Sequence, residues 1–447
     1  MDLEEQFALF PASLAGDVAT RRLRLLVLDA LGAGLAGHPH PAPTALRGLA
    51  ASPAEAQLIG AGRGDAITAS AANAAAIHAL DFDDTHGASL VHVSSVLVPV
   101  CLALAEREDL SLERFLQAYA FGLRCTAFGQ RLGPMLNGAG FHTTAVLGSV
   151  VAAAAGGWIL ARDVRRAATA AELAATTAMG LTASFGTDTK PVQVGLGTAN
   201  ATRAALLSGS GISAPRGFTA RDGLVAGLLG PDALALLRWD DRCDDAVEGV
   251  VPKPYPCCYL IHGAIRSALG LRETVGGGDR IEAVQVTIGP LAAGLALRPA
   301  VPGDSQAARF STAYCVARAL ATGHVSVADF DDPLRRPADA ETRRLVDRLT
   351  TTVDDSLGPV CARVRVRLAS GQERESSFDP ATSGAMPADD LVAKFRSNAA
   401  RSVPADRAAL VEDTVLTGGA GTTARSLARL LAGPPVTPAR GGGRTSC

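Results

Sequence analysis

Lysine is nearly absent from this sequence, which has three lysines and 39 arginines among 447 residues. Both residue types carry positive charge, but only the lysine ammonium is a compact donor whose pKa shifts readily on burial. Chemistry can therefore require lysine where a surface accepts arginine. Lys190 and Lys253 lie in the compact motifs TDTKPV and VPKPYPCC, whereas Lys394 lies in an ordinary amphipathic pattern. The first two are candidate site residues, although a compositional bias towards arginine is the competing explanation.

A strong charge of either sign is also absent, since the formal net charge is −2 and arginines alternate with acidic residues. Domains that bind nucleic acid usually present a basic stripe, and segments that bind a membrane surface a polybasic run. Neither feature is found, so we expect neither nucleic acid nor a membrane as partner. The N-terminus is acidic and lacks the basic and apolar regions of a signal peptide, which predicts a cytoplasmic protein.

The eight cysteines show no CxxC motif and no zinc-like spacing with histidine. This pattern predicts free thiols in a reducing compartment and no metal or other cofactor. The most apolar stretch, residues 143–161, consists mainly of alanine, glycine and valine and is followed directly by charged residues. We therefore expect a tightly packed internal helix there rather than a membrane span.

The apolar periodicity predicts a mainly α fold. Apolar residues recur at three- and four-residue spacing through residues 13–208, and helical texture returns at Pro387. Alternating patterns predict strands at residues 281–288, 362–368 and 373–378, the last two as a hairpin, with helices at 305–322 and 339–350. We expect a large helical domain built from both chain ends, residues 1–270 and 386–432, a smaller α+β domain at 271–385, and a disordered tail at 433–447.

The densest polar cluster is HALDFDDTH at residues 78–86, followed by HVSS at residues 92–95. The apolar residues before it predict a helix that ends at the cluster. His92 would then begin the next helix, where free N–H groups favour an anion such as a substrate carboxylate. In the competing structural interpretation, Asp83, Asp84 and the serines only end one helix and cap the next.

Three kinds of chemistry suit this cluster. An acidic helix end could bind magnesium and a diphosphate, and DFDDT at residues 81–85 matches the DxDDT motif of class II terpene cyclases. Both are disfavoured, because such cyclases shelter carbocations with aromatic walls and aromatic residues make up only 4% of this chain. The favoured interpretation is hydrogen bonding and proton transfer around a small polar substrate.

His142, in the segment GFHTT, lies at another expected helix N-terminus. With Lys190, Lys253 and His92 it forms a set of cationic or proton-donating groups at loops and helix ends. Such a set suits a substrate with two or three carboxylates, because lysine and histidine can bind carboxylates and also exchange protons. For a lone histidine, a purely structural role is about as common.

These motifs resemble, in order, those of the MmgE/PrpD family. They are HALDFDDTH with HVSS, GFHTTAVLG, TKPVQVG, KPYPCC with His262, and ARFSTAY, and the match runs from about residue 10 to residue 430. The family includes 2-methylcitrate dehydratase, cis-aconitate decarboxylase and iminodisuccinate epimerase. The resemblance implies a homodimer whose metal-free site lies between the helical domain and a smaller α+β lid domain.

The resemblance also implies the site residues, which are Asp81, Thr85, His92, His142, Lys190, Lys253 and Tyr314. His142 and Lys190 would transfer protons, while Lys253, His92 and Thr85 would position carboxylates. Asp81 would orient a neighbour, and Tyr314 would reach in from the lid. Cys258 stands where cis-aconitate decarboxylase has a histidine. We expect Cys258 and His262 to contribute to substrate binding, with no covalent step on the thiol.

The expected function is a metal-independent lyase that acts on a small di- or tricarboxylate. Dehydration of a 2-methylcitrate-like hydroxy acid is favoured. Decarboxylation and epimerisation pass through similar carbanion-like species, so both remain alternatives. A non-catalytic binding protein on the same scaffold is the alternative from another class.

Overall fold

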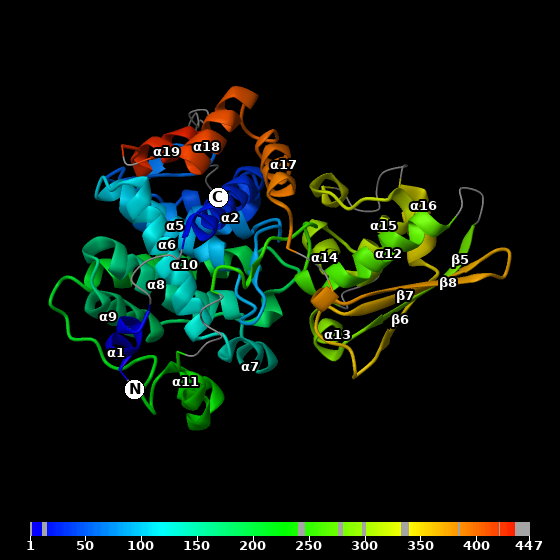
Figure 1. The fold of residues 1–447 in the computed structure, drawn as a ribbon, viewed down its shortest axis with the longest axis horizontal. Helices are drawn as coiled ribbons and strands as arrows, with labels where there is room; N and C mark the ends of the chain where they lie inside the picture. The colour runs from blue at the N-terminus through cyan, green and yellow to red at the C-terminus, as the bar shows by residue number, and fades with distance from the viewer. Residues whose placement is uncertain are drawn as a thin grey trace, which may run out of the picture.

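The computed structural model describes residues 2–10, 16–239, 246–275, 280–296, 301–331, 339–382, 385–419 and 421–433. In these residues the chain forms a large helical domain and a smaller α+β domain, which lie side by side (Figure 1). The mainly α fold predicted from the sequence is therefore confirmed. The predicted tail, apart from Gly433, lies outside the described residues.

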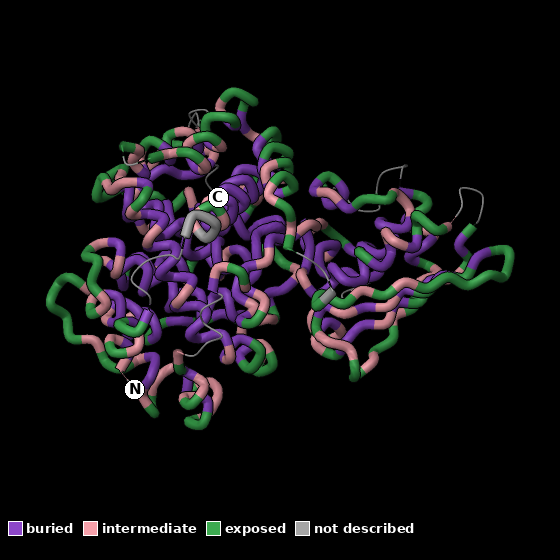
Figure 2. Tube along the Cα trace, in the orientation of Figure 1, coloured by how far each residue is buried: buried purple, intermediate pink, exposed green. Residues whose placement is uncertain are grey.

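Long helices form the body of the helical domain, and the residues in its interior are buried (Figure 2). Apolar side chains from these helices form its core. These helices are α2 (Gly16–Gly37), α4 (Ala66–His78), α5 (Val93–Arg107), α6 (Leu112–Phe128), α8 (Thr143–Ala161), α9 (Val164–Ala175) and α10 (Thr189–Leu207). Shorter helices are α1 (Leu3–Ala8), α3 (Pro41–Arg47), α7 (Leu132–Gly138) and α11 (Leu224–Leu229). Strand β1 (Ala56–Gln57) pairs antiparallel with β2 (Arg63–Gly64), and β3 (Thr85–His86) pairs antiparallel with β4 (Val250–Val251).

Helix α8 lies in the core of this domain because its side chains are small. Helices α5, α6, α9 and α10 pack around it. There is little room at the crossings, since a Cβ added to Gly156 would lie 2.7 Å from the Cβ of Ala205 in α10. By length and composition α8 could span a membrane, but 83% of its apolar window is buried inside the protein. This burial is what a core helix requires.

The smaller domain is built on a four-stranded sheet in the order β6-β5-β7-β8. Strands β5 (Ile281–Ile288), β7 (Ala362–Leu368) and β8 (Glu373–Phe378) are antiparallel neighbours, while β6 (Leu349–Val353) pairs parallel with β5. Alternate residues of β7 are buried, so one sheet face carries the apolar core. Helices α12 (His262–Thr274), α15 (Thr312–Thr322) and α16 (Ala340–Val346) pack with the sheet (Figure 1). Helices α13 (Pro290–Ala296) and α14 (Ser305–Arg309) complete the domain.

The structure contains the three predicted strands and their hairpin, but it corrects two helix predictions. The expected helix at residues 305–322 is broken into α14 and α15, because the Ser311 side chain accepts from the backbone N–H of Tyr314 and begins a new helix. The expected helix at 339–350 ends at Val346, and its last residues begin strand β6. The β-branched run LTTTV fits a half-exposed strand better than a helix.

The first domain boundary, expected at residue 270, falls inside α12. This helix packs against β7, β8 and α15, so it is part of the α+β domain, and that domain begins before His262. At the other boundary, α17 (Ala388–Ala399) and α18 (Ala405–Thr417) pack on α2, and α19 (Ala424–Leu430) packs on α5. The C-terminal segment therefore returns to the helical domain.

Close helix packing predicts the effect of one glycine substitution. Gly195 lies inside α10 where it crosses α4, and an added Cβ would lie 2.7 Å from the carbonyl oxygen of Ala71. We expect Gly195→Ala to lower the free energy of unfolding by about 1–3 kcal/mol, because overpacking outweighs the better helix propensity of alanine. Urea denaturation followed by circular dichroism measures this change.

Gly294→Ala is the matched control, because Gly294 also lies in a helix but nothing lies within 4 Å of the added Cβ. This variant should be as stable as the parent or up to about 1 kcal/mol more stable. Equal stability of the two variants would contradict the packing argument.

Candidate active site

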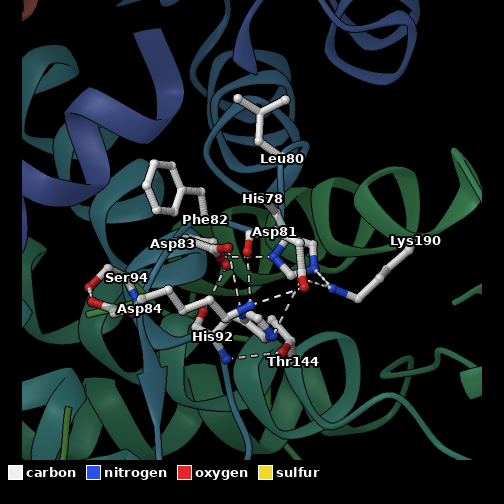
Figure 3. Close-up of polar contacts among 12 residues, drawn as sticks. His78, Leu80, Asp81, Phe82, Asp83, Asp84, His92, Ser94, Thr144 and Lys190 are labelled. Carbon is white, nitrogen blue, oxygen red and sulfur yellow. Dashed lines mark hydrogen bonds and ion pairs between the residues drawn. The ribbon is translucent and has the colours of Figure 1, made fainter. Parts of the chain in front are cut away.

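Helix ends meet where the helical domain faces the α+β domain. Helix α4 ends at His78, α5 and α8 begin directly after His92 and His142, and Lys190 lies in the first turn of α10. The helix ends expected from the sequence beside His78, His92 and His142 agree with these positions. Figure 3 shows the loop after α4, with Asp81 directed towards Lys190. Helix packing thus joins side chains as far apart in sequence as His78 and Lys190, which are separated by 112 residues.

The buried carboxylate of Asp81 binds two lysines. Lys190 Nζ lies 2.6 Å from Oδ1, while Lys253 Nζ lies 3.1 Å from Oδ2 and 3.0 Å from the Asp81 carbonyl oxygen. Burial alone would raise the pKa of Asp81, but the two ammonium groups outweigh it and hold this pKa well below its ordinary value. Asp81 is therefore ionised at neutral pH.

A hydrogen-bonded chain leads from Asp83 through His78 to Lys190. His78 Nδ1 lies 2.8 Å from Asp83 Oδ2, and His78 Nε2 lies 2.7 Å from Lys190 Nζ. Burial would raise the pKa of Asp83, but His78 and His92 hold it well below its ordinary value, so this carboxylate accepts a hydrogen bond. His78 then donates through Nδ1 and accepts from the ammonium through Nε2. The chain fixes the tautomer of His78 and the position of Lys190.

His142 is held by the side-chain amide of Gln193, one turn after Lys190 on α10. The Gln193 oxygen accepts from the N–H of Leu181 at 3.1 Å, so its nitrogen faces His142 Nδ1 at 2.6 Å and donates to it. When the ring is neutral, its proton is therefore on Nε2. No described residue forms a hydrogen bond with this buried Nε2 atom. His142 thus has a free donor for a substrate oxygen.

The histidines of the site are neutral at physiological pH. Burial, with Lys190 nearby, lowers the pKa of His142 well below its ordinary value, and burial with Lys253 nearby lowers that of His92 to about 3. Positive charge at the site therefore comes from the lysines. The neutral imidazoles can donate or accept hydrogen bonds.

A cavity of about 50 Å³ opens between these side chains and the α+β domain. Its polar lining comprises Asp81, Thr85, His92, Asn137, His142, Thr143 and Lys190, and its less polar lining Leu90, Phe185, Cys258, Tyr259, Leu260, Leu295 and Phe310. The rings of Phe185 and Phe310 each lie 5.4 Å from Lys190 Nζ. A volume of this size holds only a few water molecules, so a larger substrate requires the two domains to separate.

The structure places six of the expected site residues on the cavity, namely Asp81, Thr85, His92, His142, Lys190 and Cys258. Lys253 is fully buried behind Asp81. His262 and Tyr314 do not line the cavity. His262 Nε2 lies 3.2 Å from the carbonyl oxygen of Cys257, and the Tyr314 hydroxyl donates to the carbonyl of Asp329. Burial also raises the pKa of the Cys258 thiol to about 12, which agrees with a role without covalent chemistry.

Several residues around the site were not among those expected from the sequence. His78 and Asp83 belong to the acidic cluster itself, and Phe310 to the ARFSTAY motif, so proximity in sequence could have indicated them. Gln193 stands three residues after Lys190, which places it near the same helix face. For Phe185, which precedes α10, the sequence contains no comparable signal.

Lys394 lies on the amphipathic helix α17, as expected from the sequence, but it is not a solvated surface lysine. Its Nζ atom lies 2.8 Å from Asp29 Oδ1 and 2.8 Å from the carbonyl oxygen of Phe82, and its side chain is buried. All three lysines of the chain therefore contact Asp81 or Phe82. The scarcity of lysine thus coincides with the loop that carries the site.

Four buried side chains have the spacing of a metal site. Ligand atoms of His78, Asp81, Asp83 and His92 lie within 4.8 Å of one another. Their atoms already bind each other, however, and Asp81 is neutralised by two ammonium groups. A divalent cation would have to displace the two ammonium groups or bind against their repulsion, so these residues fit a metal poorly.

These features define a two-domain helical protein with a buried acid–base site at the domain junction. The N-terminal domain model of the MmgE/PrpD family matches residues 8–236, and its C-terminal domain model matches residues 255–417. The chain therefore belongs to the MmgE/PrpD family.

Curated relatives agree with this assignment. Cis-aconitate decarboxylase of Aspergillus terreus is 26% identical over 408 residues, which cover 83% of this chain and 82% of that protein. Cis-aconitate decarboxylase-like protein oryM of Aspergillus oryzae is 32% identical over 190 residues, or 39% of each chain. The first relative spans both domains described above.

Stability should fall when the pH is lowered from 7.5 to 5, because buried histidines take up protons on unfolding. Burial lowers the pKa of His86 to about 4, and burial with Lys253 nearby lowers those of His92 and His262 to about 3. In the unfolded chain these histidines have the ordinary pKa of about 6.5, so below that pH the unfolded state binds more protons than the folded state. Their contribution to the free energy of unfolding is therefore complete above pH 6.5 and is lost as the pH falls towards 3. Each histidine would cost on the order of 2 kcal/mol at pH 5.

Burial raises the pKa of Asp84 to about 7 and also raises the pKa values of Asp29, Glu106 and Glu172, and these four acids act with the opposite sign. Burial lowers the pKa values of four more histidines, His38, His40, His78 and His142, so seven histidines stand against four acids. Urea midpoints measured at pH 7.5 and pH 5 at constant ionic strength test the net change in stability. A midpoint that is equal or higher at pH 5 would contradict it.

Metal removal should have no effect. Dialysis against a strong chelator is expected to leave both turnover and the unfolding midpoint unchanged, because lysine ammonium groups already neutralise the acidic cluster. Activity that is lost on dialysis and returns only with added iron or magnesium would show the prediction to be wrong.

Proposed function

We propose that this protein is a lyase that acts on a small di- or tricarboxylate by proton transfer beside a carboxylate group. Dehydration of a 2-methylcitrate-like hydroxy acid is the favoured reaction. The observation that carries the proposal is that Lys190 and the free Nε2 donor of His142 line one cavity, each held by its own buried hydrogen bonds.

Lys190 is the proposed proton-transfer group. Removal of a proton from carbon requires the neutral amine, and His78 Nε2, which accepts from the ammonium at 2.7 Å and is backed by the Asp83 carboxylate at Nδ1, is the group placed to take its proton. The amine can then accept the proton of the substrate carbon. In a dehydration, the same ammonium returns this proton to the departing hydroxide, which leaves as water.

His142 and Lys253 have the supporting roles. Negative charge develops on the substrate carboxylate as the neighbouring carbon loses its proton, and the His142 Nε2–H donor stabilises that charge. Lys253 keeps Asp81 ionised and in place from behind. Thr85, whose buried Oγ1 has no hydrogen-bond partner among the described residues, is a further donor for a carboxylate on the cavity wall.

Decarboxylation of a cis-aconitate-like substrate is the second candidate. The relative of A. terreus named for that activity favours it, and so does the apolar wall formed by Leu260, Leu295 and Phe310. A carboxylate placed against such a wall loses hydration, and loss of carbon dioxide removes that cost. Cys258 stands where cis-aconitate decarboxylase has a histidine, and this difference is the reason that dehydration is preferred.

A panel of hydroxy tricarboxylates, unsaturated tricarboxylates and iminodisuccinate, followed by proton NMR in deuterated buffer, tests the proposal. New alkene signals from a hydroxy acid would support dehydration, and release of carbon dioxide would support the second candidate. Deuterium exchange without a net product would indicate epimerisation. Binding without any turnover would overturn the proposal and favour a binding protein. The homodimer and the cytoplasmic location stay predictions.

Substitution of the lysines should separate chemistry from charge. We expect Lys190→Arg and Lys253→Arg each to lower kcat/KM by about a hundredfold or more, because arginine keeps the charge but not the size or the accessible pKa. Turnover of the substrate found with the panel measures the loss, and circular dichroism checks the fold.

Lys394→Arg is the matched control, because Lys394 is also buried and also binds the loop, but it contacts neither the Asp81 carboxylate nor the cavity. We expect a loss of less than about tenfold, since arginine keeps both a cation for Asp29 and a donor for Phe82. Equal losses in all three variants would show that loop integrity, rather than Lys190 and Lys253, limits the rate.

A further inference from the structure

The loop that follows α4 is held in an unusual way. Helix α4 ends at His78, and backbone carbonyls beyond a helix end need partners from elsewhere. Four consecutive carbonyls accept hydrogen bonds from four side chains: Ala79 from Gln306 at 2.9 Å, Leu80 from Arg309 at 2.9 Å, Asp81 from Lys253 at 3.0 Å and Phe82 from Lys394 at 2.8 Å. Two of these donors belong to α14 of the α+β domain.

The loop needs such support because Asp81 has φ = 50°, in the left-handed region that residues with a Cβ rarely adopt. This backbone conformation directs the Asp81 carboxylate to Lys190 (Figure 3). The same carboxylate also reaches Lys253. A loop free to relax would take the carboxylate away from one or both ammonium groups. The carbonyls of Ala79 and Leu80 precede this turn directly.

Arg309 is unusual among the arginines of the chain. It is 1% exposed, its guanidinium stacks on the ring of Phe330 with 4.6 Å to the centroid, and no described carboxylate forms an ion pair with it. It donates to the carbonyls of Leu80 and Pro256 instead, at 2.9 and 2.6 Å. A buried cation without an anionic partner is costly, and its hydrogen bonds go to the backbone on both sides of the domain junction.

We propose that Arg309, supported by Gln306, is a positioning residue that holds Asp81 in its left-handed conformation and thereby makes the site complete only when the α+β domain is seated. Arg309 does not line the cavity, so it acts through the loop and not on the substrate. Its effect on the rate rests on the proposed function; its effect on the loop does not.

Hydrogen exchange of the free protein, followed by mass spectrometry, tests the structural part without any substrate. In Arg309→Met, amides in a peptide covering residues 79–86 should exchange at least about tenfold faster, because the loop opens more often. Exchange in β5 and β7 should be unchanged. Arg309→Lys should recover part of the protection, since it keeps a cationic donor.

Arg272→Met is the matched control. Arg272 also donates to two backbone carbonyls, those of Leu320 and Ala321, but both lie within the α+β domain. Its replacement should leave amide exchange in residues 79–86 unchanged. Gln306→Leu, a milder change on α14, should raise exchange in the same peptide to a smaller extent and keeps the proposal testable should Arg309→Met fail to fold.

With the substrate found by the panel, Arg309→Met should lower kcat at least about tenfold and change KM less than about threefold, as expected for a misplaced catalytic constellation. Unchanged exchange at residues 79–86, or a rise that spreads equally through β5 and β7, would overturn the proposal. A lower kcat with unchanged exchange would also overturn it, because Arg309 would then act on the substrate. If no compound is turned over, the proposed function fails and the exchange data still decide the role of Arg309.

Discussion

The ion pairs of Asp81 with Lys190 and Lys253 are the interaction on which the site depends. Each of the three groups is buried, and a buried charge is tolerated only when its partners are in place. Removal of Asp81 would leave two ammonium groups uncompensated in the protein interior, and removal of either lysine would leave one carboxylate oxygen without its ion pair. The packing of α4, α10 and the segment before α12 is therefore coupled to the charge balance of the site, and the same contacts keep Lys190 beside the cavity.

Dense helix packing determines the chemistry of the surrounding histidines. Small side chains on α8 and α10 let the helices approach closely, which excludes water from the helix ends that carry His92 and His142. Burial keeps these rings neutral, so they provide hydrogen-bond donors and acceptors, while the ammonium groups provide the positive charge. Such a division suits proton transfer beside a carboxylate at neutral pH.

The α+β domain contributes more than a cover. Its residues Cys258, Leu295 and Phe310 form the apolar wall of the cavity, while α14 binds the loop that carries Asp81. Seating of this domain consequently closes the cavity and, under our proposal, also orients the Asp81 carboxylate through the neighbouring residues of α14. Among members of one family, changes in this wall offer a way to alter the substrate while the lysines and histidines stay in place.

The sequence by itself determined the mainly α fold, the three principal strands and the helix ends beside His78, His92 and His142. These features depend on local patterns, that is, on apolar periodicity and on polar residues at helix ends. Six expected site residues lie on the cavity, and two of them, Thr85 and Cys258, were expected only from the family resemblance. The strand LTTTV, residues 349–353, was not predicted, because it forms only through its parallel pairing with β5.

Only the tertiary structure decided which groups bind one another. The tautomers of His78 and His142, the burial of Lys394 against Asp29, the diversion of Tyr314 to the carbonyl of Asp329, and the hydrogen bonds of Arg309 all join residues distant in sequence or on separate elements. Local propensity carries no information about such pairs. Their geometry arises when the two domains pack, because most polar groups that become buried then form a hydrogen bond.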